Sequence, residues 1–253
     1  MFAPERHQRI MSMLSVTGTA TVAQIAEELG VSAMTVRRDL QTLEEQGLLT
    51  RTHGGAILPD RNPAQEIPYI SKSAANIEAK RLIGQRAAEL VQDGDAIMID
   101  AGSTTLEVAR SLKASPLVVV TNDAAIAYTL GLRQGVTVIV PGGIMQENLY
   151  TLIHPSAIQF ISDLRVQKLF LGADAIHMEH GVTNRTLAET PSKQAMIRAA
   201  QEVILVTDSS KFGKEVFARV CGLDAIHRVI TDKGAPQEMV EQLRESGILV
   251  DLV

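Results

Sequence analysis

Residues 21–60 read TVAQIAEELGVSAMTVRRDLQTLEEQGLLTRTHGGAILPD, and this stretch predicts two short helices, a tight turn and a β-hairpin. Thr21 opens a capping box of the form T-x-x-Q, which marks the start of a helix that ends at Leu29. Gly30 breaks that helix, and Ser32 can cap the next one. Two short helices joined by a glycine-containing turn are typical of the helix-turn-helix, whose second helix reads the major groove of DNA.

The second helix has an apolar face and a polar face. Val36, Leu40 and Leu43 share the apolar face at spacings of four and three. After this helix, the runs 48–51 and 56–58 flank the turn residues THGG, which predicts a hairpin that would form a wing. The residues that we expect at DNA are Thr21, Ser32, Met34, Thr35, Arg37, Arg38, Gln41, Arg51 and His53.

The charge of this region leaves a second interpretation open. Residues 1–61 carry six arginines against seven acidic residues, so there is no overall basic footprint. A small three-helix domain with ordinary solvated charges is therefore an alternative. Most of the acids lie in the first helix and at the end of the second, whereas Arg37, Arg38, Arg51 and His53 can cluster on one surface. This placement favours DNA binding.

The same residues carry a family resemblance. GVSAMTVRRDLQTLEEQGLLTRTHGGA, at 30–56, resembles the N-terminal signature of the DeoR family of bacterial transcription regulators. That signature has the form V-S-x-x-T-[IV]-R-R-D-L followed by L-x-R-x-H-G-G-A. The resemblance implies a winged helix-turn-helix that binds double-stranded operator DNA near a promoter, usually as a repressor.

The composition is that of an ordinary intracellular globular protein, with 45% hydrophobic and 21% charged residues among 253. The net charge of −5 opposes non-specific DNA binding, so any attraction to DNA must be local. No signal peptide or membrane-spanning stretch is visible, and we expect a cytoplasmic protein with no membrane partner. The single cysteine, Cys221, lies in an apolar run and excludes an internal disulfide; we expect it to be buried rather than reactive.

A proline-rich polar stretch near Pro59 to Ile70 predicts a domain boundary. We predict a winged helix-turn-helix DNA-binding domain over 3–58, a linker over 59–72 and an effector-binding sensor domain over 73–253. A helix is expected to open the sensor domain, from Ser73 to Val91.

The rest of the chain alternates short apolar runs with helical segments, which predicts an α/β fold with a mostly parallel, doubly wound sheet. The predicted strands are Ala96–Asp100, Leu117–Thr121, Val136–Pro141, Lys168–Ala173, Val203–Thr207, Arg228–Thr231 and Ile248–Val253. The predicted helices are Thr104–Leu112, Ala124–Leu132, Ala157–Leu164, Ser192–Ala200 and Pro236–Ser246. Such folds bind ligands beyond the carboxyl ends of their strands.

Polar residues follow five of these strands. After the first comes Gly102-Ser103-Thr104-Thr105 at a helix start, where backbone N–H groups and hydroxyls can cradle a phosphate. Taken alone, these residues could simply cap the helix. The other strand ends carry Thr121-Asn122, Gly142-Gly143, Gly172-Ala173-Asp174 and Asp208-Ser209-Ser210-Lys211. Five consecutive polar strand ends favour one shared pocket over separate turns.

The segments IDAGSTT, VTND, VPGG, FLGADAI and VTDSSKFG resemble the C-terminal sensor domain of the DeoR family. That domain is similar in fold to ribose-5-phosphate isomerase, glucosamine-6-phosphate deaminase and coenzyme A transferases, which implies a phosphorylated sugar as effector. The resemblance implies that Gly102, Ser103, Thr104 and Thr105 hold the phosphate. It places Asp100, Asn122, Gly142, Gly143, Asp174 and Lys211 at the same ligand. Glu189 and Lys193 match a further E-x-x-x-K element.

Four residues keep two interpretations each. His154 stands where the family more often has glycine, and it either leads a helix or sets effector specificity. His177 and His180 resemble a metal pair in composition, but they lie in a turn, so we expect no metal site. Lys211 is either an exposed turn lysine or an effector ligand that Phe212 shields from water.

Together these patterns predict a transcription regulator, and we expect a repressor of a carbohydrate operon that a phosphorylated sugar relieves. One helix-turn-helix reads only a half-site, so we expect a homo-oligomer, a dimer or tetramer. We expect no cofactor and no catalytic residues. The alternatives are a sugar-phosphate isomerase-like enzyme with an appended DNA-binding domain, since acids and bases such as Asp100 and Lys211 are present, and an architectural DNA-binding protein with a vestigial second domain.

Overall fold

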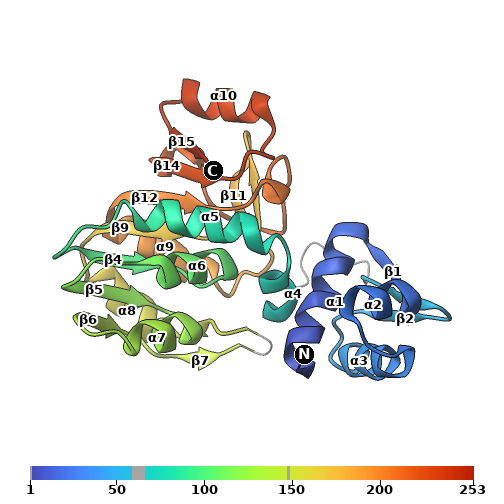
Figure 1. Ribbon diagram of the computed structural model, residues 1–253. Coiled ribbons are helices and arrows are strands. Elements are labelled where there is room, and N and C mark those ends of the chain that lie inside the picture. Colours follow the sequence, from blue (N-terminus) through green and yellow to red (C-terminus); the bar gives the residue numbers. More distant parts are fainter. Residues whose placement is uncertain (1, 59–65, 147–148) are drawn as a thin grey trace. The chain divides into compact units, whose positions relative to one another are not determined.

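The computed structural model describes residues 2–58, 66–146 and 149–253, and the chain divides into two compact units (Figure 1). The N-terminal unit comprises 1–62 and 67–77, and the C-terminal unit comprises 63–66 and 78–253. The first part of the predicted linker, 59–65, lies outside the described residues. The part that follows forms a helix of the N-terminal unit.

The N-terminal unit contains four helices and a small antiparallel sheet among the described residues. Its elements are α1 (Ala3–Thr17), β1 (Thr19–Thr21), α2 (Val22–Leu29), α3 (Ala33–Glu45), β2 (Thr50–Thr52), β3 (Gly55–Ile57) and α4 (Tyr69–Ala74). The capping box at Thr21 and the Ser32 cap both form, which confirms the predicted starts of α2 and α3. The predicted hairpin is β2–β3, and β1 adds a third strand beside β3 that the sequence did not predict.

One core holds this unit together. The apolar residues predicted on α3 are buried, as are Ile10 and Leu14 of α1. Ala74 of α4 packs into the same cluster. The helix-turn-helix is therefore supported by the helix before it and by the short helix after the hairpin.

The C-terminal unit is built on one parallel sheet. Its strands are β4 (Ala96–Ile99), β5 (Leu117–Thr121), β6 (Val136–Ile139), β9 (Val166–Leu171), β12 (Ala200–Val206), β14 (Arg228–Thr231) and β15 (Leu249–Leu252). They lie in the order β15-β14-β12-β9-β4-β5-β6, and every neighbouring pair is parallel. All seven predicted strands and the predicted doubly wound α/β class are confirmed, with small shifts at the strand ends.

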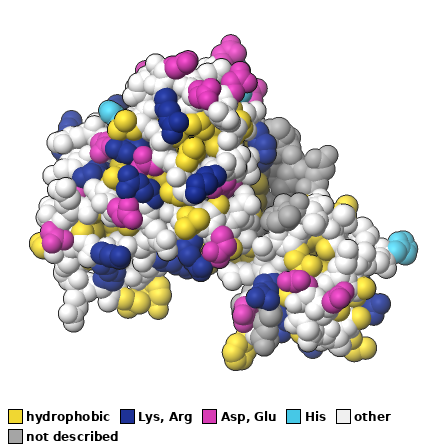
Figure 2. Space-filling model, turned by 45° about the horizontal axis from the view of Figure 1, so that its top comes forward, with side chains coloured by type: hydrophobic (Ala, Val, Ile, Leu, Met, Phe, Trp, Pro, Cys, Tyr) yellow, Lys and Arg dark blue, Asp and Glu magenta, His cyan; other side chains and the backbone are white. Residues whose placement is uncertain are grey.

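Helices cover both faces of this sheet, with α5 and α6 on one face and α8 and α9 on the other (Figure 1). They are α5 (Ile77–Ala88), α6 (Ser103–Ser111), α7 (Ala124–Gly131), α8 (Pro155–Ser162), α9 (Thr190–Ala199) and α10 (Gln237–Glu245). Within the described ranges, no helix has both the length and the apolar character needed to cross a membrane. Figure 2 shows Lys and Arg interspersed with Asp and Glu on the viewed face of the larger unit, so this face carries no extended field of one sign.

Two expectations about secondary structure were wrong or incomplete. The predicted single helix Ser73–Val91 is broken, because α4 ends at Ala74 and Asn76 takes a left-handed backbone conformation with φ 52° before α5 begins. The sequence also missed a second antiparallel sheet and a hairpin. These are β10 (Ala175–His177), β11 (Gly181–Asn184) and β13 (Ala218–Cys221), with the pair β7 (Ile144–Met145) and β8 (Leu152–Ile153). Strands of two to four residues show too little periodicity to be recognised, and β11 pairs with a partner far along the chain.

The strand order places a topological switch point between β4 and β9. From β4 the chain builds outward through β5 to β6, then returns to β9 on the other side of β4 and builds outward to β15. The loops that leave β4 and β9 therefore depart toward opposite faces of the sheet. Open α/β sheets bind ligands at such a switch point, beyond the carboxyl ends of the strands.

The close packing of α5 on α6 gives a test of the fold. A Cβ added at Gly84 of α5 would lie 2.5 Å from the backbone C and O atoms of Glu107 in α6. We expect Gly84→Ala to lower the free energy of unfolding by about 1–3 kcal/mol, because the backbone must shift to relieve the overlap. Gly131→Ala is the control, since no atom lies within 4 Å of its added Cβ, and it should be neutral or stabilise by up to about 1 kcal/mol. Chemical denaturation followed by circular dichroism measures both, and equal free energies for the two variants would contradict the close approach.

Candidate functional site

The outer face of α3 carries the residues predicted to read DNA. Met34 is 79% exposed, and Arg37, Arg38 and Gln41 are also exposed. Thr35 is half-buried, and its backbone N–H donates to the Ser32 hydroxyl at 3.2 Å. Ser32 and Thr21 are both helix caps, so each has a structural role whether or not it also contacts DNA. The structure thus brings an exposed Met, two Arg and a Gln onto one helix at the turn.

A buried ion pair behind α3 was missed by the sequence analysis. Asp39, in the R-R-D-L motif, is 5% exposed and accepts hydrogen bonds from Arg6 Nε at 2.7 Å and Arg6 Nη2 at 2.9 Å. His7 Nε2 lies 3.2 Å from the same carboxylate. Burial opposes the charge on Asp39, but Arg6 and His7 outweigh it and hold the pKa of Asp39 below its ordinary value. Asp39 therefore ties α3 to α1 and positions the exposed arginines beside it on the helix.

The wing lies beside the end of α3. The Arg51 backbone N–H donates to Glu44 Oε1 at 2.8 Å, and Arg51 Nη1 lies 3.7 Å from Glu44 Oε2, so Glu44 anchors β2 to α3. Both Arg51 and His53 are exposed. Their contact with phosphates stays a prediction.

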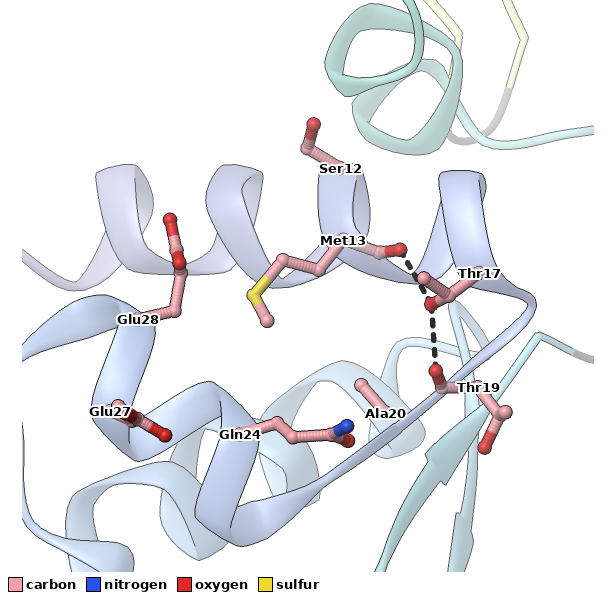
Figure 3. Close-up of a pocket in the computed structure, with 8 residues that line it drawn as sticks. All are labelled: Ser12, Met13, Thr17, Thr19, Ala20, Gln24, Glu27 and Glu28. Carbon is pink, nitrogen blue, oxygen red and sulfur yellow. Dashed lines mark hydrogen bonds between the residues drawn. The ribbon is translucent and has the colours of Figure 1, made fainter.

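A hollow of about 680 Å³ lies elsewhere on the N-terminal unit, between α1, β1 and α2 (Figure 3). Its rim includes Glu27 and Glu28, and its wall includes Met13 and Gln24. The Thr17 hydroxyl lies within hydrogen-bond distance of two backbone oxygens, that of Met13 one turn earlier in α1 and that of Thr19 just after the helix. Two carboxylates repel a phosphate backbone, so this hollow does not extend the candidate DNA-reading surface.

In the C-terminal unit, the polar ends of β4 and β9 meet at the switch point. Asp100 follows β4 and is 1% exposed, and its Oδ2 accepts a hydrogen bond from the backbone N–H of Gly172, at the end of β9, at 3.0 Å. Lys193 of α9 donates to the same Oδ2 and to the Gly172 carbonyl oxygen, the latter at 3.1 Å. One buried salt bridge therefore joins the ends of two neighbouring strands to a helix.

Glu189 extends this cluster at the start of α9. Its two oxygens accept hydrogen bonds from the Thr151 hydroxyl at 2.9 Å and from Asn184 Nδ2 at 2.7 Å. Both partners are buried, and the sequence analysis named neither. Thr151 precedes a two-residue strand and Asn184 ends a short hairpin, so no local pattern could have identified them.

The electrostatics of the cluster follow from burial and an excess of acids. Burial raises the pKa of Asp100, Glu189 adds to this effect, and Lys193 opposes it. Burial disfavours the charge on Lys193, but Asp100, Glu189 and Asp174 outweigh that cost and raise the pKa of Lys193. Lys193 is therefore a firmly charged centre among carboxylates.

The predicted phosphate cradle lies at the start of α6. Gly102 has φ 154° and ψ 165°, a conformation essentially restricted to glycine, and it turns the chain from β4 into the helix. The Thr105 hydroxyl donates to the Gly102 carbonyl oxygen at 2.8 Å, which folds the loop back on itself. Ser103 and Thr104 are half-buried at the first two positions of α6.

A residue that the sequence analysis did not select, Asp123, lies at this cradle. Its Oδ2 accepts from the Gly102 backbone N–H at 3.3 Å, and its Oδ1 accepts from the N–H groups of Ala125 and Ile126 at 2.8 and 3.0 Å. Burial raises the pKa of Asp123 to about 6, against the effect of these three donors. An Asp directly before a predicted helix is a capping signal, and that signal was present in VTND.

Several buried polar atoms at these strand ends have no hydrogen-bond partner within the described residues. They are Asp100 Oδ1, Asn122 Oδ1 and Ser192 Oγ, all in side chains at most 2% exposed. Leaving a buried polar atom unpaired costs about 1–3 kcal/mol, and such atoms are otherwise rare in folded proteins. Asp100 pairs with Lys193, Ser192 precedes Lys193 in α9 and Asn122 follows β5, so each unpartnered atom is a candidate to bind a polar ligand.

The structure places the other predicted effector residues around the same sheet edge with varied contacts. Asp174 is buried after β9, and it accepts from the Arg185 backbone N–H at 3.1 Å. Close packing explains the glycine at position 143, because a Cβ there would lie 2.8 Å from the backbone nitrogen of Ile153. Lys211 lies half-buried in the short 3₁₀ helix η1 (Ser209–Lys211), beside the buried Phe212 as expected.

The structure shows the surroundings of the remaining histidines and of the cysteine. His154 caps α8, since its Nδ1 accepts from the Ser156 backbone N–H at 3.2 Å. The rings of His177 and His180 stack at 4.8 Å, and among the described residues no three His, Cys, Asp or Glu side chains are arranged to hold a metal ion. Burial raises the pKa of Cys221 to about 11, which disfavours the reactive thiolate.

Comparison with known families identifies both units of the chain. Residues 6–62 match the family described as the DeoR-like helix-turn-helix domain. Residues 75–233 match the family described as the DeoR C terminal sensor domain. The chain belongs to the DeoR family. This DeoR-family protein is therefore a transcription regulator with an N-terminal DNA-binding domain and a C-terminal sensor domain, as the sequence patterns predicted.

Full-length relatives agree with this assignment. The HTH-type transcriptional regulator GlpR of Haloferax volcanii is 35% identical over 251 residues, which covers 99% of this chain and 98% of that protein. The glycerol-3-phosphate regulon repressor of Escherichia coli is 30% identical over 249 residues, 98% of each chain. The HTH-type transcriptional repressor GlcR of Bacillus subtilis is 34% identical, covering 98% of this chain and 95% of its own.

Solved structures resemble the fold more distantly. The full-length sorbitol operon regulator SorC from Klebsiella pneumoniae covers 95% of this chain and 98% of its own, with a TM-score of 0.43 and 14% identity. Ribose 5-phosphate isomerase A from Neisseria gonorrhoeae covers 53% of this chain and 52% of its own, with a TM-score of 0.38 and 19% identity.

The buried salt bridge of this DeoR-family sensor gives a testable stability effect. We expect Lys193→Met to lower the free energy of unfolding by about 3–5 kcal/mol, because it leaves the Asp100 carboxylate buried without its counter-ion. Adding Asp100→Asn to that variant should restore part of the loss, since the buried charge is then gone. Lys113→Met, at an exposed position, is the control and should change stability by less than about 0.5 kcal/mol. Denaturant titration measures all four proteins, and a double variant no more stable than Lys193→Met would contradict the pairing.

Proposed function

We propose that this DeoR-family regulator represses a carbohydrate-use operon and that a phosphorylated sugar or polyol phosphate relieves the repression. The observation that carries the effector class is the loop at Gly102, which opens a helix N-terminus beside the buried Asp100–Lys193 pair at the switch point of the sheet. The name of the Escherichia coli relative, a glycerol-3-phosphate regulon repressor, supports the same chemical class. The protein would act in the cytoplasm, where both the DNA and such metabolites are found.

We assign DNA binding to one unit and effector binding to the other. The domain over 3–58 would bind operator DNA through the exposed face of α3 and the wing, with Arg38 and Gln41 at base edges and Arg51 and His53 at phosphates. The domain over 73–253 would bind the effector. Its phosphate would lie on the N–H groups and hydroxyls of 102–105, and its hydroxyls would meet the unpartnered Asp100 and Asn122 oxygens.

Effector and operator must be linked through alternative arrangements of the protein. One helix-turn-helix reads a half-site, so we propose a homo-oligomer, a dimer or tetramer, that places two heads on the operator. An effector shifts such an assembly only as far as its affinities for the arrangements differ. The effector would therefore bind more tightly to an arrangement that spaces the heads incorrectly for the operator.

We propose that the sensor domain has no enzymatic activity. Thr151 and Asn184 bind both oxygens of Glu189, and Lys193 forms an ion pair with Asp100, so neither carboxylate is arranged as a free general base. Incubation with ribose 5-phosphate, glucose 6-phosphate and glucosamine 6-phosphate should leave each compound unchanged. Turnover of one of them would favour the isomerase-like alternative.

The DNA-reading face is tested by Arg38→Ala. A single arginine that contacts a base edge or phosphate contributes about 1–3 kcal/mol, so operator affinity should fall about 5- to 150-fold per half-site while folding is unchanged. The control is Arg81→Ala, an exposed arginine of the C-terminal unit. Gel shifts at fixed salt with the promoter DNA next to the gene measure both variants. Unaltered affinity for Arg38→Ala would assign DNA reading to another face.

The effector site is tested by Ser103→Ala combined with Thr104→Ala. Thermal melting of the wild-type protein should shift upward with a phosphorylated compound from a panel that includes glycerol 3-phosphate, ribose 5-phosphate and glucose 6-phosphate, but not with glycerol, ribose or glucose. The double variant should bind at least about 10-fold more weakly, because two hydroxyl donors to a charged phosphate are lost. It should still bind operator, and Ser111→Ala at the far end of α6 should behave as wild type. Equal stabilisation of the double variant would place the phosphate elsewhere.

A further inference from the structure

The first N–H group of the proposed phosphate cradle, that of Gly102, already binds a carboxylate of the protein. The helices α6 and α7 begin near each other, and the Asp123 carboxylate bridges their two N-termini through the N–H groups of Gly102, Ala125 and Ile126. Helix N-termini attract negative charge, so a carboxylate and a phosphate are competing ligands for such a position. Asp123 is 1% exposed, which means that water screens its charge poorly.

We propose that Asp123 occupies the cradle in the effector-free protein and that a phosphate binds there only when Asp123 takes up a proton from solvent. The inference rests on the proposed function, because it assumes that the effector's phosphate lies on the loop that begins at Gly102. A dianionic phosphate placed on that loop would lie against the Asp123 carboxylate, and two like charges at contact distance in a buried site cannot both persist. Protonation removes the repulsion and leaves one oxygen free to cap α7.

The groups around Asp123 favour its protonation when a phosphate binds beside it. From β4 comes the Asp100 carboxylate, which further raises the pKa of Asp123 and is itself bound to Lys193 of α9. Thr151, which lies just before β8, pairs with Asp123 through the backbone in an isolated β-bridge. The Thr151 hydroxyl donates to Glu189. The beginnings of α6 and α7 contribute the N–H groups of Gly102, Ala125 and Ile126. The charges that reach Asp123 are thus dominated by acids, and an added phosphate raises its proton affinity further.

The linkage has a definite sign. Burial gives Asp123 a pKa of about 6 in the free protein, and a bound anion raises that pKa, so binding near neutral pH takes up a proton. Binding is therefore strongest below the pKa of the free protein and weakens as the pH rises above it. The apparent affinity falls in proportion to the protonated fraction.

The test uses sulfate as the probe, because sulfate stays dianionic over the whole pH range and its own titration cannot mimic the effect. The full-length protein is melted against increasing sulfate at constant ionic strength, at about pH 5.5 and about pH 7.5. For the wild type, the sulfate Kd should rise about 25-fold between these two pH values, which is the fall in the protonated fraction of Asp123. Asp123→Asn keeps a helix-capping side chain without the charge, and its Kd should be independent of pH and equal to that of the wild type at low pH.

Controls separate the possible failures. Asp95→Asn removes a half-buried carboxylate at the opposite end of β4 and should keep the pH dependence of the wild type. Asp123→Ser, another capping residue, gives a second uncharged variant if Asp123→Asn folds poorly. Sulfate binding with the same pH dependence in wild type and Asp123→Asn, or with none in the wild type, would overturn the role of Asp123 alone. If sulfate stabilises none of the proteins at either pH, the phosphate cradle itself is wrong, and the proposed effector site falls with it.

Discussion

The salt bridge between Asp100 and Lys193 is the contact on which the sensor domain depends. It joins the ends of β4 and β9, the two strands between which the sheet reverses its direction of growth, to the helix that starts at Glu189. A buried ion pair contributes little net stability compared with apolar packing, but breaking it leaves an uncompensated charge. The pair therefore fixes how the loops after β4 and β9 are arranged. Asp100 and Asn122, whose Oδ1 atoms have no hydrogen-bond partner within the described residues, follow β4 and β5 at the same end of the sheet.

In the N-terminal unit, an ion pair between Arg6 and Asp39 fixes the orientation of α3. Asp39 faces away from the exposed side of α3 and binds Arg6 with both carboxylate oxygens, which fixes the rotation of the helix about its own axis. Because Arg37 and Arg38 precede Asp39 directly, fixing one side chain inward sets which way the arginines point. The R-R-D sequence thus combines two arginines that point outward with one aspartate that points inward and whose charge Arg6 balances.

The proposed effector site is unusual in the balance of its charges. A site for a phosphorylated ligand would be expected to gather cations, yet Lys193 is surrounded by Asp100, Glu189 and Asp174, and Asp123 lies at the cradle itself. The attraction for an anion must then come from backbone N–H groups and helix N-termini, which carry no counter-charge and cannot be neutralised by pairing. Carboxylates beside such donors suit the hydroxyls of a sugar, which donate hydrogen bonds to them.

Local patterns were enough to predict the helix-turn-helix, all seven parallel strands and the strand ends that carry the polar residues. These features depend on periodicity, caps and turns, which are properties of neighbouring residues: the capping box at Thr21 is one example and the Gly102 loop is another. The break at Asn76, the small sheet that contains β11, and the partners of Glu189 depend instead on residues brought together from distant parts of the chain. Asp123 shows the difference most clearly. The segment VTND predicts that Asp123 caps α7, because an Asp directly before a helix is a capping signal. Its hydrogen bond to Gly102 exists only because parallel pairing places the ends of β4 and β5 side by side.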